Sequence, residues 1–93
     1  MIRVLIERHV ATELEAHYDL AARETLQKAM HAAGFISGEA LHNVDNPSHR
    51  LLLATYRSVN DWHHWYHSEA RREMMERITP MLEREETITI FTH

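Results

Sequence analysis

The sequence predicts an α+β fold of the ferredoxin-like type, in which a four-stranded antiparallel sheet carries two helices in the order β-α-β-β-α-β. Three observations predict it. Two segments with apolar residues three or four positions apart alternate with four segments rich in β-branched residues. Gly34 and the turn cluster 45–48 lie between these segments, where a helix and a hairpin must end. The 93 residues suffice for one domain, spanning residues 1–93.

The first strand is expected over Ile2–Val10 and the first helix over residues 13–33. Thr12 is typical of a helix cap, and Glu15 three residues later completes a capping box. Gly34 then ends the helix. Alternation along the strand divides its side chains between two faces, with Ile2, Val4 and Ile6 on one and Arg3, Leu5, Glu7 and His9 on the other.

Three further strands are expected over Phe35–Val44, Arg50–Arg57 and Thr87–Thr92, because these segments are rich in apolar and β-branched residues. The second of them contains three consecutive leucines, which indicates that both of its faces are covered. The charged segment 83–86 before the last strand is expected to face solvent.

The second helix is expected within Tyr56–Leu82, continuing or restarting through residues 68–78. Asp61 or Asn60 can cap its start, and Pro80 lies where a helix ends. One face of this helix carries Trp62, Trp65 or Tyr66, Ala70, Met74 and Ile78. Because both tryptophans of the protein lie within one helical turn, we expect a ligand to be held against that turn.

Composition excludes several classes of function. Ten basic and 14 acidic residues give a net charge of −4 without a basic block, so nucleic acid is not expected as a partner. The absence of cysteine excludes thiolate-based catalysis and cysteine metal sites. No apolar run approaches the ~20 residues that span a bilayer, and no signal peptide is visible, so we expect a cytoplasmic protein without a membrane partner.

The strands offer apolar side chains to both faces of the sheet, whereas the helices of this arrangement cover one face only. Ile2, Val4 and Ile6 cannot all face water beside the other apolar strand residues without creating a large exposed patch. We therefore expect a homodimer in which two sheets pack face to face.

Glu7 and His9 share a strand face and are the candidate proton acceptors. If that face meets the helices, a carboxylate and an imidazole lie in an apolar cleft near Trp62 and Trp65, where desolvation favours their uncharged forms, as suits a general base. The alternative is that both lie in water at the end of the strand. The tryptophans likewise are either core residues or a flat wall for a planar aromatic ligand.

His63 and His67 are four residues apart on a helix and could together chelate a metal. Two histidines supply only half a site, and with His64 they lie opposite much of the apolar stripe. We therefore expect this cluster to face solvent and predict no metal site. No glycine-rich phosphate loop or nucleophile elbow is present, so redox chemistry needs a bound cofactor or a substrate that itself reacts with oxygen.

In the order of its elements and in several short motifs, the chain resembles the antibiotic biosynthesis monooxygenase (ABM) domain family over nearly its whole length. The motifs are Gly34-Phe35, Tyr56-Arg57-Ser58, Trp62-x-x-Trp65-x-x-Ser68, Arg72 and Ile78-x-Pro80-x-Leu82. The resemblance implies a dimeric α+β barrel with a ligand cleft between the helices and the sheet of each subunit. Members of the family include cofactor-independent oxygenases of aromatic anthrones, quinol oxygenases and haem-degrading enzymes.

Three hypotheses follow. The first is a cofactor-independent monooxygenase of a planar aromatic or quinol-like molecule, with catalytic Glu7, His9 and Trp65 and substrate-binding Leu5, Trp62 and Tyr66. The second is haem binding or degradation. Trp65 matches the helix tryptophan of the haem-degrading branch of the family. Glu7 occupies the position where that branch has asparagine, and its haem-ligating histidine would align near Met75. The third is a non-catalytic, dimeric module that binds a small molecule.

Overall fold

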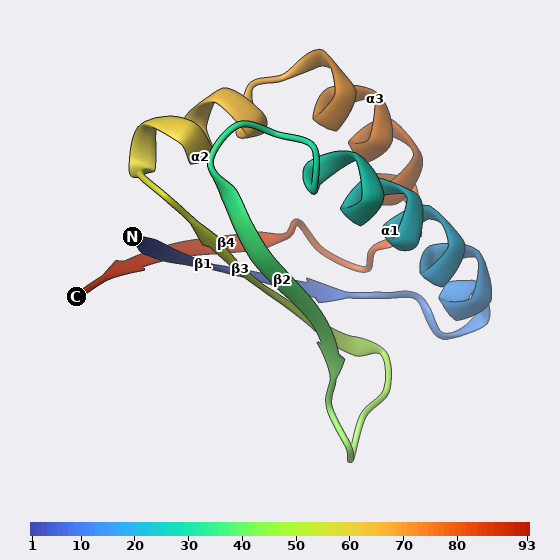
Figure 1. The fold of residues 1–93 in the computed structure, drawn as a ribbon. Coiled ribbons are helices and arrows are strands. Elements are labelled where there is room, and N and C mark those ends of the chain that lie inside the picture. The colour runs from blue at the N-terminus through green and yellow to red at the C-terminus, as the bar shows by residue number, and fades with distance from the viewer.

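Strand β1 (Ile2–His9) lies inside a four-stranded sheet and pairs with a neighbour on each side (Figure 1). In this computed structural model, which describes residues 1–93, the strand order is β2-β3-β1-β4 and all pairings are antiparallel. The other strands are β2 (Phe35–His42), β3 (His49–Tyr56) and β4 (Thr87–Thr92). The order of the elements confirms the predicted ferredoxin-like fold.

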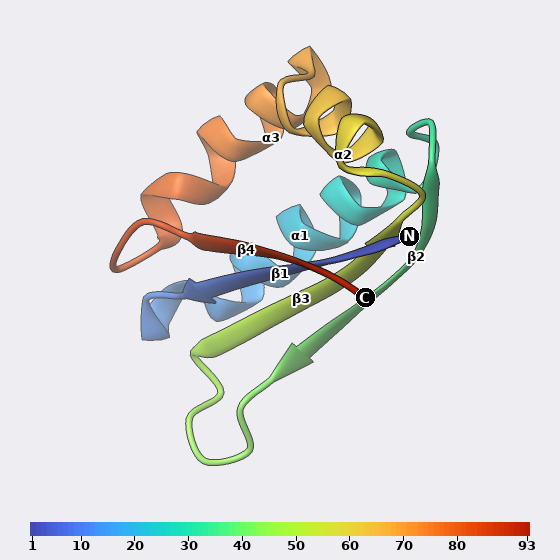
Figure 2. The same cartoon turned by 90° about the vertical axis from the view of Figure 1, so that its left-hand side faces the viewer.

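Three helices cover one face of this sheet and leave the opposite face open (Figures 1 and 2). They are α1 (Glu15–Ala29), α2 (Val59–Tyr66) and α3 (Glu69–Ile78), and short 3₁₀ turns lie at Thr12–Leu14 and Thr79–Met81. None of the helices is both long and apolar enough to cross a bilayer.

The face of β1 that meets the helices carries Ile2, Val4 and Ile6, all of which are buried. The prediction that these three side chains would require a second chain to cover them is therefore wrong, because the helices pack on the more apolar face of the strand. The open face nevertheless has an apolar part of its own. We call it the open-face patch, and it consists of Leu5, Leu41, Leu51, Leu53 and Phe91.

The chain enters α1 through a 3₁₀ turn, and the predicted capping box is absent. The Thr12 hydroxyl lies 3.5 Å from that of Ser48, and the Glu15 carboxylate accepts a hydrogen bond from Arg50 at 3.3 Å. Both side chains are thus engaged by the loop and strand facing them, so neither is free to satisfy the helix N–H groups. At the other end, α1 stops at Ala29, four residues before the predicted end.

The aromatic segment forms two short helices instead of one, each capped by a serine. The Ser58 hydroxyl oxygen accepts a hydrogen bond from the Asp61 N–H at 3.1 Å, and that of Ser68 accepts one from the Arg71 N–H at 3.2 Å. The predicted caps Asn60 and Asp61 are therefore inside α2. A serine at the start of each helix explains the restart, because its hydroxyl satisfies an otherwise unpaired backbone donor.

Candidate functional site

A small cavity between the helices and the sheet is lined by both tryptophans. Its volume is about 30 Å³, and we call it the inner cavity. Trp62 and Trp65 are only 2% and 7% exposed, because positions three apart in α2 both face the sheet. The Trp62 ring meets the Tyr56 ring edge-on at a centroid distance of 5.4 Å. On its other side, the Tyr56 ring makes an edge contact with the Phe35 ring at a centroid distance of 5.5 Å. One wall of the cavity is therefore largely aromatic.

Two buried guanidinium groups line the same cavity. Arg8 of β1 and Arg71 of α3 are 3% and 6% exposed, and both bind the carboxylate of Glu86. Arg8 Nε donates to Glu86 Oε2 at 2.8 Å, and Arg71 Nη2 donates to Oε1 at 2.5 Å. Arg8 also donates to the Tyr18 hydroxyl at 3.0 Å. Two cations share one carboxylate, so the cluster carries an excess positive charge beside the aromatic wall.

The charged forms of Arg8, Arg71 and Glu86 stabilise one another. Burial alone would raise the pKa of the Glu86 carboxyl, but the charges and hydrogen bonds of Arg8 and Arg71 outweigh it and lower that pKa. Burial likewise opposes the charge of Arg8, yet Tyr18 and Glu86 raise its pKa above the ordinary value. Burial raises the pKa of Tyr56 to about 12 against the opposing effect of Arg71, so its phenol stays protonated at neutral pH.

Sequence reasoning did not identify these charged residues, although two of them follow the apolar patterns. Arg8 continues the alternation of the buried face of β1 after Ile6. Arg71 lies three residues before Met74, which puts it on the buried face of α3. Glu86 belongs to a segment that was expected to face solvent, and nothing in the local sequence distinguishes it from its charged neighbours.

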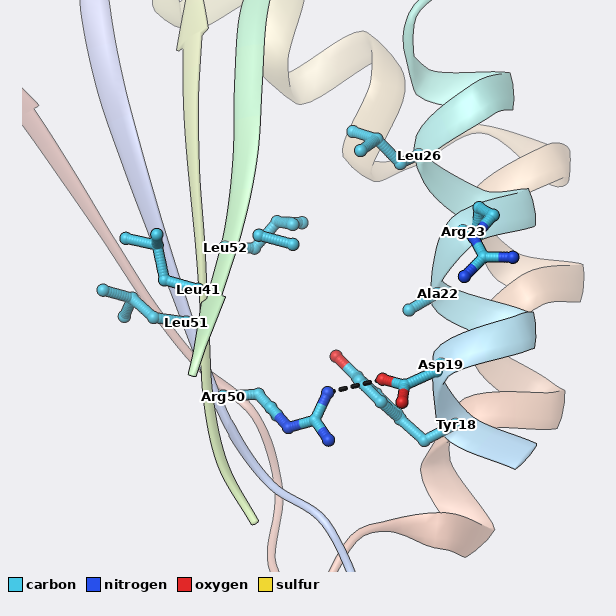
Figure 3. Close-up of a pocket in the computed structure, with 10 residues that line it drawn as sticks. Tyr18, Asp19, Ala22, Arg23, Leu26, Leu41, Arg50, Leu51 and Leu52 are labelled. Carbon is cyan, nitrogen blue, oxygen red and sulfur yellow. Dashed lines mark hydrogen bonds and ion pairs between the residues drawn. The ribbon is translucent and has the colours of Figure 1, made fainter. Parts of the chain in front are cut away.

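A larger groove of about 260 Å³ adjoins the inner cavity between α1 and strands β2 and β3, and we call it the outer groove (Figure 3). The two spaces share Ala22, Leu26 and Leu52 as lining residues. Leu26 of α1 and Leu52 of β3 point toward each other across the gap (Figure 3). At the far end of the groove, Arg50 Nη1 donates to Asp19 at 2.5 Å. Leu26 and Leu52 therefore lie at the boundary between the outer groove and the inner cavity.

The predicted site residues divide between the two faces of the sheet. Trp62 and Trp65 line the inner cavity, whereas Leu5, Glu7 and His9 lie on the open face. Glu7 or His9 could act as a base beside the tryptophans only if their face of β1 met the helices. It does not, because alternation along β1 turns Ile6 and Arg8 toward the helices instead. The sixth predicted residue, Tyr66, is 40% exposed on the outer side of α2.

Tyr66 covers Arg71 from outside. The Arg71 guanidinium lies 4.7 Å from the centroid of the Tyr66 ring and 5.9 Å from that of Trp62. The guanidinium thus lies close to two neighbouring aromatic rings, whose electrons attract its positive charge. Tyr66 therefore contacts the site through Arg71 and does not line the cavity.

Neither the inner cavity nor the outer groove has a histidine in its lining. His63, His64 and His67 are exposed, and the rings of His63 and His67 lie 6.3 Å apart. Met75, which takes the place of the haem-ligating histidine in the resemblance, accepts a long hydrogen bond from Arg8 through its sulfur at 3.6 Å. The cavity residues thus offer no imidazole ligand for a haem iron. A histidine-containing group of possible metal ligands lies on the open face instead.

Comparisons with known proteins add the following findings. The family described as antibiotic biosynthesis monooxygenase matches residues 1–77. No protein of curated function matches the sequence. Among solved structures, a conserved protein from Methanosarcina mazei Go1 superposes with a TM-score of 0.91 at 18% identity, over 97% of this chain and 89% of that chain.

A second solved structure is a mutant form of SnoaB, a cofactor-independent oxygenase from Streptomyces nogalater. It superposes with a TM-score of 0.89 at 11% identity, over 99% of this chain and 91% of that chain. At such identities the two superpositions establish a common fold.

Proposed function

Because the chain belongs to the antibiotic biosynthesis monooxygenase family, we propose that it oxygenates a planar, electron-rich aromatic or quinol-like molecule held between its helices and its sheet. The observation that carries the proposal is the pair of buried guanidinium groups, Arg8 and Arg71, beside the wall formed by Trp62 and Trp65. In this proposal residues 1–93 act as one domain, and the substrate reduces oxygen without a cofactor.

For an anthrone-type substrate, the proposed reaction begins with loss of a proton from a CH₂ group flanked by aromatic rings. The resulting carbanion is delocalised onto the ring oxygen atoms and transfers electrons to O₂, forming a C–O bond and a peroxide. Loss of the second proton from this carbon, with cleavage of the O–O bond, leaves one oxygen atom on carbon as a carbonyl and releases the other as water. The four electrons that reduce O₂ all come from the oxidation of CH₂ to C=O, so no further reductant is needed.

The guanidinium groups suit the anionic stage of this reaction. Their N–H donors are already fixed by Glu86 and need little reorganisation when negative charge develops nearby. Because Arg8 and Arg71 are buried, little water screens the attraction between their positive charges and the anionic substrate. The same attraction makes the substrate more acidic, and its proton would pass to solvent water. The proposal assigns no proton transfer to Glu7 or His9, which lie on the other face of the sheet.

The outer groove is the proposed position of the substrate rings. A cavity of about 150 Å³ is what holds one benzene molecule in a protein interior, so the inner cavity of about 30 Å³ accepts only the edge of a ring system. The outer groove of about 260 Å³ has room for the remainder. Movement of Leu26 and Leu52 would connect the two spaces and bring a substrate oxygen toward Arg71.

A homodimer belongs to the same proposal. The open-face patch would pack against the same patch of a second copy, sheet to sheet. The two helix–sheet cavities would then lie on the outer sides of the assembly, where substrate can reach both.

Oxygen uptake tests the proposal directly. Purified protein is supplied with a panel of anthrones and hydroquinones, and saturable uptake above the spontaneous rate is expected for at least one of them. Arg71→Gln should reduce the catalysed rate by about a hundredfold, as expected for loss of one oxyanion donor. Arg72→Gln is the matched control, because Arg72 is the next residue and is exposed.

Trp65→Phe keeps an aromatic core residue and should weaken substrate binding while the protein stays folded. Uptake that never exceeds the spontaneous rate would contradict the oxygenase proposal. If ligands then still quench tryptophan fluorescence saturably, the cavity is a binding site without turnover.

A further inference from the structure

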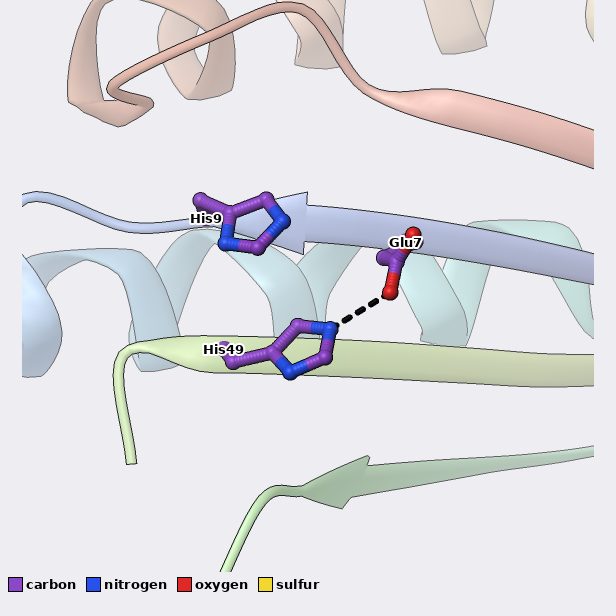
Figure 4. Close-up of side chains that lie close together, drawn as sticks. All are labelled: Glu7, His9 and His49. Atoms are coloured by element: carbon purple, nitrogen blue, oxygen red, sulfur yellow. Dashed lines mark hydrogen bonds and ion pairs between the residues drawn. The ribbon is translucent and has the colours of Figure 1, made fainter. Parts of the chain in front are cut away.

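A group of possible metal ligands lies on the open face, away from the cavity and the groove. Oxygen and nitrogen atoms of Glu7, His9 and His49 all lie within 4.8 Å of one another (Figure 4). The antiparallel pairing of β1 with β3 brings them together: His9 is directly opposite His49, and Glu7 is two residues earlier on the same face. The group lies at the rim of the sheet, because His9 ends β1 and His49 begins β3.

We propose that Glu7, His9 and His49 bind one divalent transition-metal ion, with Zn²⁺ as the representative ion. Imidazole nitrogen together with a carboxylate oxygen is a donor set that zinc and its neighbours prefer. Three protein ligands leave a fourth position for water or for a group of another molecule. This site is independent of the proposed oxygenation, since none of its residues lines the inner cavity or the outer groove.

The three side chains are neighbours, held at present by a hydrogen bond and by ring stacking. His49 Nε2 lies 2.5 Å from Glu7 Oε2, so an ion would take the place of the proton between them. The imidazole rings of His9 and His49 are parallel within 3° at a centroid distance of 4.6 Å. Ligand atoms on a tetrahedral zinc ion are about 3.4 Å apart, given bonds of about 2.0–2.1 Å. To bind one ion, the side chains would therefore rotate from their present stacked and hydrogen-bonded positions.

The site is also accessible. In the single chain, the side chains of His49 and Glu7 are 28% and 40% exposed, so an ion can reach them from solvent. In the proposed homodimer, which covers Leu51 opposite Glu7, the ion would enter from the rim of the sheet, where β1 ends and β3 begins. The present contact of His49 with Glu7 is a partly buried hydrogen bond, which metal–ligand bonds would replace.

Asn43 controls the proton on His49. The Asn43 side-chain oxygen accepts hydrogen bonds from the N–H groups of Asp45 and Asn46, at 2.8 and 3.3 Å. Its NH₂ group therefore faces His49 Nδ1, at 3.2 Å, and donates to it. This bond leaves the ring proton on Nε2, the atom that a metal would bind. A carboxylate at position 43 would instead accept a hydrogen bond from Nδ1–H, which leaves the lone pair of Nε2 free for a metal, as in carboxylate–histidine–zinc sites.

Calorimetric titration of untagged protein with Zn²⁺ at neutral pH tests the site, and one ion per chain is expected. His9→Ala and Glu7→Gln should each weaken binding by about tenfold or more, because each removes one of three ligands. Asn43→Asp should strengthen it by about tenfold, through the effect on His49. His63→Ala is the matched control and should leave the affinity unchanged.

A second readout is the visible absorption of bound Co²⁺, which should be intense for a tetrahedral site and lost in His9→Ala. The His9 variant is decisive, because the hydrogen bond between Glu7 and His49 does not need His9. Zinc affinity that is equal in wild type and His9→Ala, or that is lost in His63→Ala instead, would overturn the proposal. Circular dichroism of each variant verifies that the fold is retained.

Discussion

The Arg8 guanidinium donates a hydrogen bond to the Glu86 carboxylate at 2.8 Å, although 78 positions separate the two residues in the chain. Arg8 belongs to the inner strand of the sheet, and Glu86 lies just before the edge strand β4. The second carboxylate oxygen of Glu86 binds Arg71 of the helix layer. One carboxylate thus connects the sheet to the helices and fixes both cations beside the tryptophans.

Glu86→Gln is expected to destabilise the protein by about 3 kcal/mol, near the lower end for breaking a buried ion pair, because glutamine keeps one acceptor oxygen. The loss arises because Arg8 and Arg71 remain buried without a counter-charge. Urea unfolding followed by circular dichroism measures it. Glu69→Gln, which breaks the exposed pair with Arg72, is the control and should leave the unfolding midpoint unchanged. Equal midpoints for wild type and Glu86→Gln would contradict this account of the cluster.

Low pH should remove the stability that the ion pairs of Glu86 with Arg8 and Arg71 provide. The pKa of Glu86 is lower in the folded protein than the ordinary value of 4.5, so the unfolded chain takes up this proton first as the pH falls. The stabilisation is complete above about pH 4.5 and is lost as the pH falls through the folded-state pKa. Urea unfolding between pH 7 and pH 3 should therefore show a steeper loss of stability for wild type than for Glu86→Gln. Parallel curves for the two proteins would refute the assignment to Glu86.

The fold followed from the sequence because its signals are local. Alternation along β1 correctly placed Ile2, Val4 and Ile6 on one face of the strand. Helical spacing correctly placed Trp62 and Trp65 on one face of the aromatic helix. Which face of β1 meets the helices is not a local property, since it depends on the packing of every other element. The choice of cap was also missed, because Ser58 precedes two residues that can cap a helix equally well.

The candidate site was only partly predictable for the same reason. Its tryptophans follow from helical spacing, and Arg8 could have been recognised as a charged residue at an apolar position. Contact of Glu86 with Arg8 depends on the way the last loop folds back, and no pattern in the sequence specifies that. His49 similarly joins Glu7, 42 positions away in the chain, only through the register of β1 against β3.

Leu26→Trp is expected to block the route from the outer groove to the inner cavity. Leu26 lines both spaces, and an indole there would occupy the volume proposed for the substrate rings. The rate of oxygen uptake should fall by about tenfold or more, while overpacking costs about 1–3 kcal/mol of stability. Leu20→Trp, at a position of the same helix that is 55% exposed, should retain the wild-type rate. A Leu26→Trp protein with an unchanged rate would exclude the outer groove as the substrate position.

Leu53→Asp tests the proposed assembly through the open face. Leu53 lies directly opposite Leu5 in the middle of the open-face patch, where sheet-to-sheet packing would bury it. A carboxylate at this position would lose its water without gaining a partner, so the dissociation constant should rise by about a hundredfold, equivalent to about 2.7 kcal/mol. Analytical ultracentrifugation should then find a dimer for wild type and a monomer for the variant at the same concentration. Val44→Asp is the control, since Val44 is 93% exposed in the hairpin loop and lies outside the patch. If wild type sediments as a monomer, or if Leu53→Asp remains dimeric, the open face is not the surface through which two copies associate.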